Sequence, residues 1–163
     1  VDERHGVRFG HGNPIRRASE QSHITGMTQL GIRNVSSSNR NDHKAAQAAG
    51  STILSVRDVR RLGPEGVLAL IPEGMNYYIT IDIDGFDPSI APGTGTPSHG
   101  GFNYYEVMEI LQGVAHKGEV VGIDLCEVAP DYDHSGSTSI LAAQVLMNLI
   151  GYVFHARAQR HES

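Results

Sequence analysis

The sequence predicts an α/β fold in which helices cover a mostly parallel sheet. Four strand-like segments alternate with four helical segments along the 163 residues, and this alternation is typical of parallel strands joined by helical crossovers. The two longest loops follow strands that end in acidic residues, which is where such sheets carry their sites. Because no repeat, low-complexity tract or linker divides the sequence, we treat residues 1–163 as part of a single domain.

The first half of the chain supplies two of the strands. Residues 26–35 (GMTQLGIRNV) are strand-like, and residues 42–50 (DHKAAQAAG) form an Ala-rich helix that a glycine stops. A second strand follows over 51–56 (STILSV). The next helix lies within 63–74, where Pro64 stands near the first turn and apolar residues recur at helical spacing.

The second half repeats the alternation. A strand over 76–84 (NYYITIDID) leads through a Gly/Thr/Pro-rich loop to an amphipathic helix over 103–118. A further strand over 119–128 (EVVGIDLCEV) precedes a long apolar helix over 137–160. Four strands are few for a parallel sheet with such loops, and Val1 does not resemble a natural start. We therefore expect a chain that is truncated at its N-terminus.

The composition excludes several classes of partner. A net charge of −5 and a pI near 6.0, with no long Lys/Arg run to meet phosphates, argue against nucleic acid. No continuous apolar run approaches the roughly 18 residues of a membrane helix, so no membrane association is expected. The single cysteine, Cys126, excludes an internal disulfide framework and fits a reducing compartment such as the cytoplasm.

The aspartates of the stretch TIDIDGFDP are the first candidate site. Asp82 and Asp84 are two residues apart at the end of an apolar strand, so regular alternation places them on one face with Thr80. Two neighbouring carboxylates repel unless a cation lies between them. They either hold a metal or bind backbone amides. An EF-hand is excluded because Gly85 is fourth in the motif, not sixth.

The loop that follows supports a site at this place. The segment PGTGTP combines glycines with prolines, which suits a stiffened loop that holds hydroxyls and amides in place. About 18 residues without regular structure are long for a plain connection in a compact domain.

Two further elements carry candidate groups. HGNPIRRASE, residues 11–20, places His11 in a loop before a short helix, and Arg16 and Arg17 in it suit a solvated helix face, salt bridges at a subunit contact or an anion clamp. In GIDLCEVAP, Glu127 follows Asp124 by three positions and faces the opposite way if the strand stays regular. A fixed carboxylate of this kind suits a guanidinium. Cys126 fits a small core residue better than a nucleophile.

These three elements together resemble the ureohydrolase family, which includes arginase, agmatinase and guanidinobutyrase. The resemblance runs from about His11 to Phe154. The aspartate motif and the APGTGTP loop are specific to the family, although Thr80 stands where many members have Ser, and HGNPIRRA is closer to agmatinase than to arginase.

The resemblance implies an arginase–deacetylase type of three-layer α/β sandwich and a hydrolase with two Mn²⁺ ions per active site. It implies that Asp82 and Asp84 bind metal and that a dimanganese-bound hydroxide attacks a guanidino carbon, giving urea and an amine. His11 and Glu127 are then catalytic, while Glu127, Thr96 and Asn13 bind the substrate. It also implies a homo-oligomer.

Part of the family pattern is absent from the chain. An upstream histidine and an HxDAHxD-type stretch supply the other metal ligands of the family, and neither is present; Asp2 is a candidate for the last carboxylate of that stretch. An alternative is therefore a catalytically incomplete remnant that acts through assembly with an intact partner. A deacetylase on the same scaffold fits the GTGTP loop and Glu127 less well. Agmatine, 4-guanidinobutyrate, guanidinopropionate and guanidine all remain open as substrates.

Overall fold

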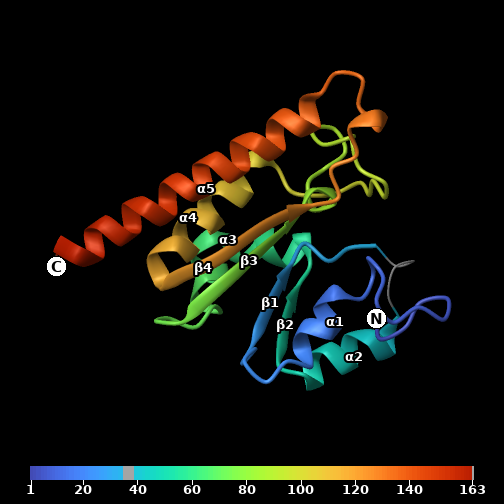
Figure 1. Ribbon diagram of the computed structural model, residues 1–163, viewed down its shortest axis with the longest axis horizontal. Helices are drawn as coiled ribbons and strands as arrows, with labels where there is room; N and C mark the ends of the chain where they lie inside the picture. The colour runs from blue at the N-terminus through green and yellow to red at the C-terminus, as the bar shows by residue number, and fades with distance from the viewer. Residues whose placement is uncertain (35–38, 163) are drawn as a thin grey trace. The chain divides into compact units, whose positions relative to one another are not determined.

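The computed structural model describes residues 1–34 and 39–162, so the strand end expected at Val35 lies outside the described residues. The chain divides into two compact units, Val1–Ser55 and Val56–Ser163. Each unit contains one pair of parallel strands (Figure 1). The prediction of an α/β chain with parallel strands is confirmed.

The N-terminal unit contains helices α1 (Pro14–Ser19) and α2 (Arg40–Ala48) and strands β1 (Met27–Leu30) and β2 (Ser51–Leu54). The two strands are parallel, with Met27 opposite Ser51 at one end and Leu30 opposite Leu54 at the other. Helix α2 begins where it does because Asn39 and Asp42 form a capping box, each side chain accepting from the other's backbone N–H.

The C-terminal unit contains helices α3 (Val56–Ala69), α4 (Tyr104–Lys117) and α5 (Ser137–Glu162). Its strands are β3 (Asn76–Asp82) and β4 (Glu119–Cys126), which pair in parallel. Two single 3-10 turns, Ile83–Gly85 and Pro130–Tyr132, follow the carboxyl ends of these strands. Both long loops of the unit therefore start at the same edge of the sheet, as expected for a parallel pair.

Helix α3 is longer than its sequence pattern predicted. Pro64 begins a helical segment as expected, but a first segment from Val56 precedes it, and the two meet at a kink. Gly63 lies at the kink with φ +70° and ψ 170°, a conformation that glycine adopts without steric conflict. The missed segment buries Val56 and Val59, three residues apart on one face.

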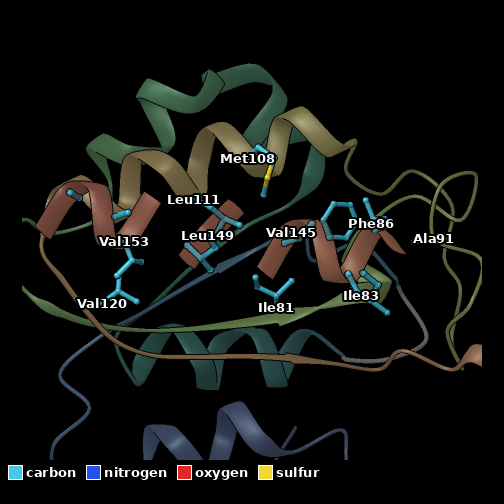
Figure 2. Close-up of a cluster of buried hydrophobic side chains, with 14 residues drawn as sticks. Ile81, Ile83, Phe86, Ala91, Met108, Leu111, Val120, Val145, Leu149 and Val153 are labelled. Carbon is cyan, nitrogen blue, oxygen red and sulfur yellow. The ribbon is translucent and has the colours of Figure 1, made fainter. Parts of the chain in front are cut away.

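The core of the C-terminal unit lies between one face of the β3–β4 sheet and helices α4 and α5. Figure 2 shows strand residues beneath side chains from the two helices. Ile83, Val145 and Leu149 are fully buried in this cluster. The opposite face of the sheet is more open, since Tyr78 is 61% and Val121 60% exposed.

Helix α5 is apolar on more than the face that packs in the core. Val145 and Leu149 point into the core, whereas Met147 is 72% and Phe154 63% exposed. Among the described residues this is the one helix long and apolar enough to cross a membrane by length and composition. The core helix of a soluble protein meets the same criterion, and the buried apolar residues of α5 belong to the cluster of Figure 2.

Candidate active site

The carboxyl end of β3 turns sharply instead of continuing as a strand. Strand β3 ends at Asp82, and the Asp82 carboxylate accepts a hydrogen bond of 3.0 Å from the N–H of Asp84. Residues 83–85 therefore form a 3-10 turn. The expected strand alternation of Asp82 and Asp84 is wrong, because the aspartate side chain competes for the backbone N–H that a strand would use. The two carboxylates nevertheless stay close together.

The loop from Phe86 to Asn103 is fastened at its base. Phe86 and Phe102 form a parallel bridge, and the N–H of Asp87 donates to the carbonyl of Phe102 at 3.0 Å. The Asp87 carboxylate accepts from the N–H groups of Gly100 at 2.8 Å and Gly101 at 3.1 Å. Hydrogen bonds from Ser89 and from these glycines hold the pKa of Asp87 well below its usual range.

The same loop is fastened again near its tip. Thr94 forms an antiparallel bridge with Val128, and Gly93 accepts a 2.8 Å hydrogen bond from the N–H of Ala129. The loop then brings the Thr96 hydroxyl to Asp84 Oδ2 at 2.9 Å. Residues after β3 and residues after β4 therefore form one structure beside the aspartates.

Glu127 lies directly before this bridge and has an unusual backbone conformation. Its φ is +65°, in the left-handed region that costs a non-glycine residue about 1–2 kcal/mol. Strand β4 ends one residue earlier, at Cys126, so the regular alternation that would turn Glu127 away from Asp124 does not hold. Backbone strain of this kind persists only where surrounding contacts impose it, as at many active sites.

The strand ends carry concentrated negative charge. The pKa of Asp82 is raised to about 6, first because surrounding protein atoms displace water from its carboxyl and then by the charges of Asp84 and Glu127. The charges of Asp84 and Glu127 thus disfavour ionisation of Asp82 in the absence of a cation. A site of this character favours a metal ion, a guanidinium or both.

Asp124 and Cys126 lie on the neighbouring strand. Asp124 Oδ1 accepts a 2.7 Å hydrogen bond from the Thr80 hydroxyl, which supports a structural role beside the site. The prediction that Cys126 lies in the core is wrong, because its thiol is exposed. It remains a poor nucleophile, since desolvation and then the charges of Asp82 and Asp124 raise its pKa to about 11.

His11 and Asn13 lie in the N-terminal unit, before and at the start of α1. His11 is exposed in the loop. Asn13 is 2% exposed, and both ends of its amide bind backbone: Oδ1 accepts from Gly10 N–H at 3.2 Å, and Nδ2 donates to the carbonyl of Val1 at 3.1 Å. Asn13 therefore holds its loop in shape, and its role in substrate binding stays a prediction.

Asp2 is surrounded by arginines. Its carboxylate pairs with Arg17, Arg8 and Arg16, and the hydrogen bond from Arg17, followed by the charges of Arg8, Arg17 and Arg16, lowers the pKa of Asp2. Arg16 and Arg17 also pair with Glu20. Both arginines thus form salt bridges within the chain, and the subunit contact expected for them stays a prediction.

A divalent metal fits the chemistry of the aspartate pair but not the number of donors. Asp82 and Asp84 provide hard oxygen ligands of the kind that Mn²⁺ prefers. Within residues 1–34 and 39–162, however, no group of three or more His, Cys, Asp or Glu side chains is placed to hold a metal ion. The pair therefore suits part of a metal site rather than a whole one.

Sequence reasoning missed three residues that hold the site together. Arg60 of α3 donates to Glu106 Oε1 at 2.7 Å and to the carbonyl of Gly101 at 2.9 Å, so it secures the base of the loop. Thr138, in the first turn of α5, accepts from the N–H of Gly93 near the loop's tip, and Asp133, just before α5, accepts from the N–H of Thr138. The sequence signal for Asp133 and Thr138 was a cluster of capping residues, DHSGST, before an apolar helix.

Comparison with known proteins identifies the family. The model of the Arginase family matches residues 1–151, which span both units. Proclavaminate amidinohydrolase of Streptomyces clavuligerus is 37% identical over 161 residues, covering 96% of this chain and 50% of that protein. Guanidinobutyrase of Pseudomonas aeruginosa is 33% identical over 154 residues, covering 91% and 48%.

Solved structures agree with this assignment. The agmatine ureohydrolase of Thermoplasma volcanium superimposes with a TM-score of 0.83 at 28% identity, covering 98% of this chain and 53% of that one. The chain thus spans about half the length of the relatives it matches. The resemblance inferred from the aspartate motif, the GTGTP loop and HGNPIRRA is confirmed, and the chain belongs to the arginase family.

Proposed function

We propose that the protein to which this chain belongs hydrolyses a guanidino compound of the agmatine or 4-guanidinobutyrate class, giving urea and an amine. The observation that carries the proposal is the joining of two loops at one sheet edge, where Thr96 binds Asp84 and Glu127 stands beside Asp82. Two relatives whose names state a guanidino substrate, a guanidinobutyrase and a guanidinopropionase, are 33% and 32% identical to this chain over 91% and 87% of its length.

We assign Glu127 to the substrate guanidinium. Two parallel N–H groups of a guanidinium match the two oxygens of one carboxylate, which fixes the orientation of the reacting carbon. The strained backbone of Glu127 and the bridge that follows it favour a carboxylate held in place before the substrate arrives. Preorganisation of this kind lowers the entropy lost on binding.

Asp82 and Asp84 would hold the Mn²⁺ ions, together with ligands that the described part of the C-terminal unit does not provide. Two such ions would lower the pKa of a water molecule enough for it to attack a guanidinium carbon at neutral pH. Thr96, bonded to Asp84 Oδ2, would orient that carboxylate. We assign His11 to donate a proton to the departing amine nitrogen as its bond to carbon breaks.

A second candidate function is an incomplete enzyme that acts only after assembly with an intact partner. The lack of a third metal donor among the described residues favours it. We further propose that the protein is a cytoplasmic homo-oligomer without nucleic-acid or membrane partners. The absence of a long basic run supports the exclusion of nucleic acid.

The deciding experiment measures Mn²⁺ binding by isothermal titration and urea release from four substrates on one sample. These are agmatine, 4-guanidinobutyrate, 3-guanidinopropionate and guanidine. We expect manganese-dependent urea release from agmatine or 4-guanidinobutyrate. Asp82→Asn and Asp84→Asn should each weaken Mn²⁺ binding by at least about tenfold, the size expected for loss of one charged ligand.

Glu127→Gln should abolish urea release with little change in Mn²⁺ affinity. Glu109→Gln, which removes an exposed carboxylate from α4, is the matched control and should behave as wild type. These measurements use the whole protein to which the chain belongs, and its failure both to bind Mn²⁺ and to release urea from any of the four compounds would overturn the first candidate. Recovery of activity on mixing that inactive protein with an intact arginase-family enzyme bearing a silenced site would establish the second.

A further inference from the structure

We propose that Thr138, fixed by Asp133, is a positioning residue that sets the place of Glu127 and Thr96 through the backbone of Gly93. The inference rests on the proposed function only where it assigns a guanidinium to Glu127. It concerns the first turn of α5 and Asp133 just before it, to which the proposed function assigns no group.

The contact begins with a buried hydroxyl. Thr138 is 0% exposed, and its Oγ1 accepts a 2.8 Å hydrogen bond from the N–H of Gly93. The loop comes so close at this point that a Cβ on Gly93 would lie 2.8 Å from Asp133 Cβ and 2.9 Å from Thr138 Oγ1. Gly93 is therefore held by a specific donor–acceptor pair within a close backbone approach.

Asp133 fixes the threonine. Its Oδ2 accepts a 2.7 Å hydrogen bond from the N–H of Thr138, and its Oδ1 accepts from the N–H of Ser135 at 3.0 Å and the hydroxyl at 2.6 Å. The carboxylate thus binds the start of α5 and the turn before it, where helix N–H groups lack partners of their own. A charged acceptor with several donors holds its neighbours more firmly than a neutral one.

The held glycine acts on both sides of the site. The Gly93 carbonyl accepts from the N–H of Ala129 at 2.8 Å, and Thr94 bridges Val128. The backbone immediately after Glu127 is therefore paired, and this pairing imposes the φ of +65° on Glu127. Three residues after Gly93 the same loop presents Thr96 to Asp84. A shift of Gly93 would therefore displace the Glu127 carboxylate and the Thr96 hydroxyl together.

Thr94 supports the view that this loop is built for a fixed shape. It is 3% exposed, and its hydroxyl has no hydrogen-bond partner within the described residues. A buried hydroxyl without a partner is unfavourable, so the loop keeps this conformation because its backbone contacts, chiefly those of Gly93 and Val128, impose it.

The test compares Thr138→Val, which keeps the shape but loses the acceptor, with Thr138→Ser, which keeps the acceptor. The full chain is used. In the valine variant, hydrogen exchange at the amides of Gly93 and Ala129 should accelerate by at least about tenfold, because one buried hydrogen bond is lost. Amides in the middle of α5 should exchange as in wild type, and the serine variant should be within about threefold of wild type everywhere.

Asp133→Asn serves as a second route to the same answer if the valine variant fails to fold. It should also accelerate exchange at Gly93. Unchanged exchange at Gly93 and Ala129 in a folded valine or asparagine variant would overturn the inference. So would acceleration spread evenly over α5, because that would show general destabilisation rather than positioning.

Binding of agmatine, measured by titration, separates this inference from the proposed function. Thr138→Val should raise the agmatine Kd by about tenfold, as a displaced charged contact does, while Thr138→Ser should not. An unchanged Kd in the valine variant would overturn the link to Glu127. Failure of wild type to bind any of the four guanidino compounds would instead refute the guanidinium assignment, and the exchange data would still decide whether Thr138 holds the loop.

Discussion

The base of the site loop offers a test in which one added methyl group should be decisive. A Cβ on Gly101 would lie 2.4 Å from the carbonyl carbon of Phe86, 2.5 Å from its oxygen and 2.5 Å from the nitrogen of Asp87. All three are backbone atoms, so no side-chain rotation relieves the contact. Gly101→Ala must therefore separate the two loop segments that meet at the Phe86–Phe102 bridge.

The expected magnitude comes from the hydrogen bonds that this separation breaks. They are Gly101 N–H to Asp87 Oδ2, Phe102 N–H to Gly85 O, and Asp87 N–H to Phe102 O. At about 1 kcal/mol each the loss is about 3 kcal/mol. Alanine also restricts the unfolded chain, which returns about 0.4–1 kcal/mol. The free energy of unfolding should thus fall by about 2 kcal/mol.

Gly95→Ala is the matched control, because it lies in the same loop and no atom beyond its chain neighbours lies within 4 Å of the place that its methyl group would take. That variant should be neutral or slightly more stable than wild type. Equilibrium urea unfolding followed by circular dichroism measures both at constant denaturant slope. Should the two variants differ by less than about 0.5 kcal/mol, within the scatter of ordinary surface substitutions, the argument from close approach is refuted.

Three further predictions concern the core, the thiol and acid stability. Leu149→Ala, at a fully buried position, should lower the free energy of unfolding, measured by urea denaturation, by about 3–4 kcal/mol. Met147→Ala, at a residue that is 72% exposed, should change it by less than about 0.5 kcal/mol. Equal effects of the two substitutions would refute the assigned faces of α5. In metal-free protein the Cys126 thiol, with its pKa raised to about 11, should be alkylated by iodoacetamide much more slowly at pH 8 than an ordinary thiol and should accelerate up to about pH 11; a rate already at its plateau at pH 8 would contradict this. Hydrogen bonds to the Asp87 carboxylate, first from Ser89, lower the pKa of Asp87 in the folded protein. The contribution of Asp87 to stability is therefore complete above its unfolded pKa of about 3.9 and is lost as the pH falls through its folded pKa. Asp87→Asn should therefore flatten the decline in unfolding free energy below about pH 4, whereas the exposed Asp131→Asn should leave that decline in place.

Periodicity and turn residues were sufficient to place the strands and most helices of the fold. Apolar runs located β2, β3 and β4, and Pro64 marked the start of the second segment of α3. The first segment was missed although Val56 and Val59 lie at helical spacing, because the charged residues between them obscured the pattern. Local composition thus predicted the existence of elements better than their ends.

The site was predictable in its residue types but not in its geometry. The aspartate motif located the end of β3. The turn there forms because the Asp82 side chain accepts a hydrogen bond from the N–H of Asp84, and the alternation pattern of a strand does not take such side-chain hydrogen bonds into account. The conformation of Glu127 depends on pairing with a loop more than thirty positions earlier in the sequence. Cys126 was placed in the core because cysteine is usually buried, whereas in the structure it is the last residue of β4 and is exposed.

The positive φ of Glu127 sets stability and activity against each other at one position. Glycine is the residue that this backbone would accept most readily, so Glu127→Gly should gain folding stability in the same step that removes the carboxylate. Selection for thermal tolerance alone would then discard the carboxylate that we assign to guanidinium recognition. A glutamate in this backbone conformation is what the proposed chemistry requires, at a cost to the stability of the fold.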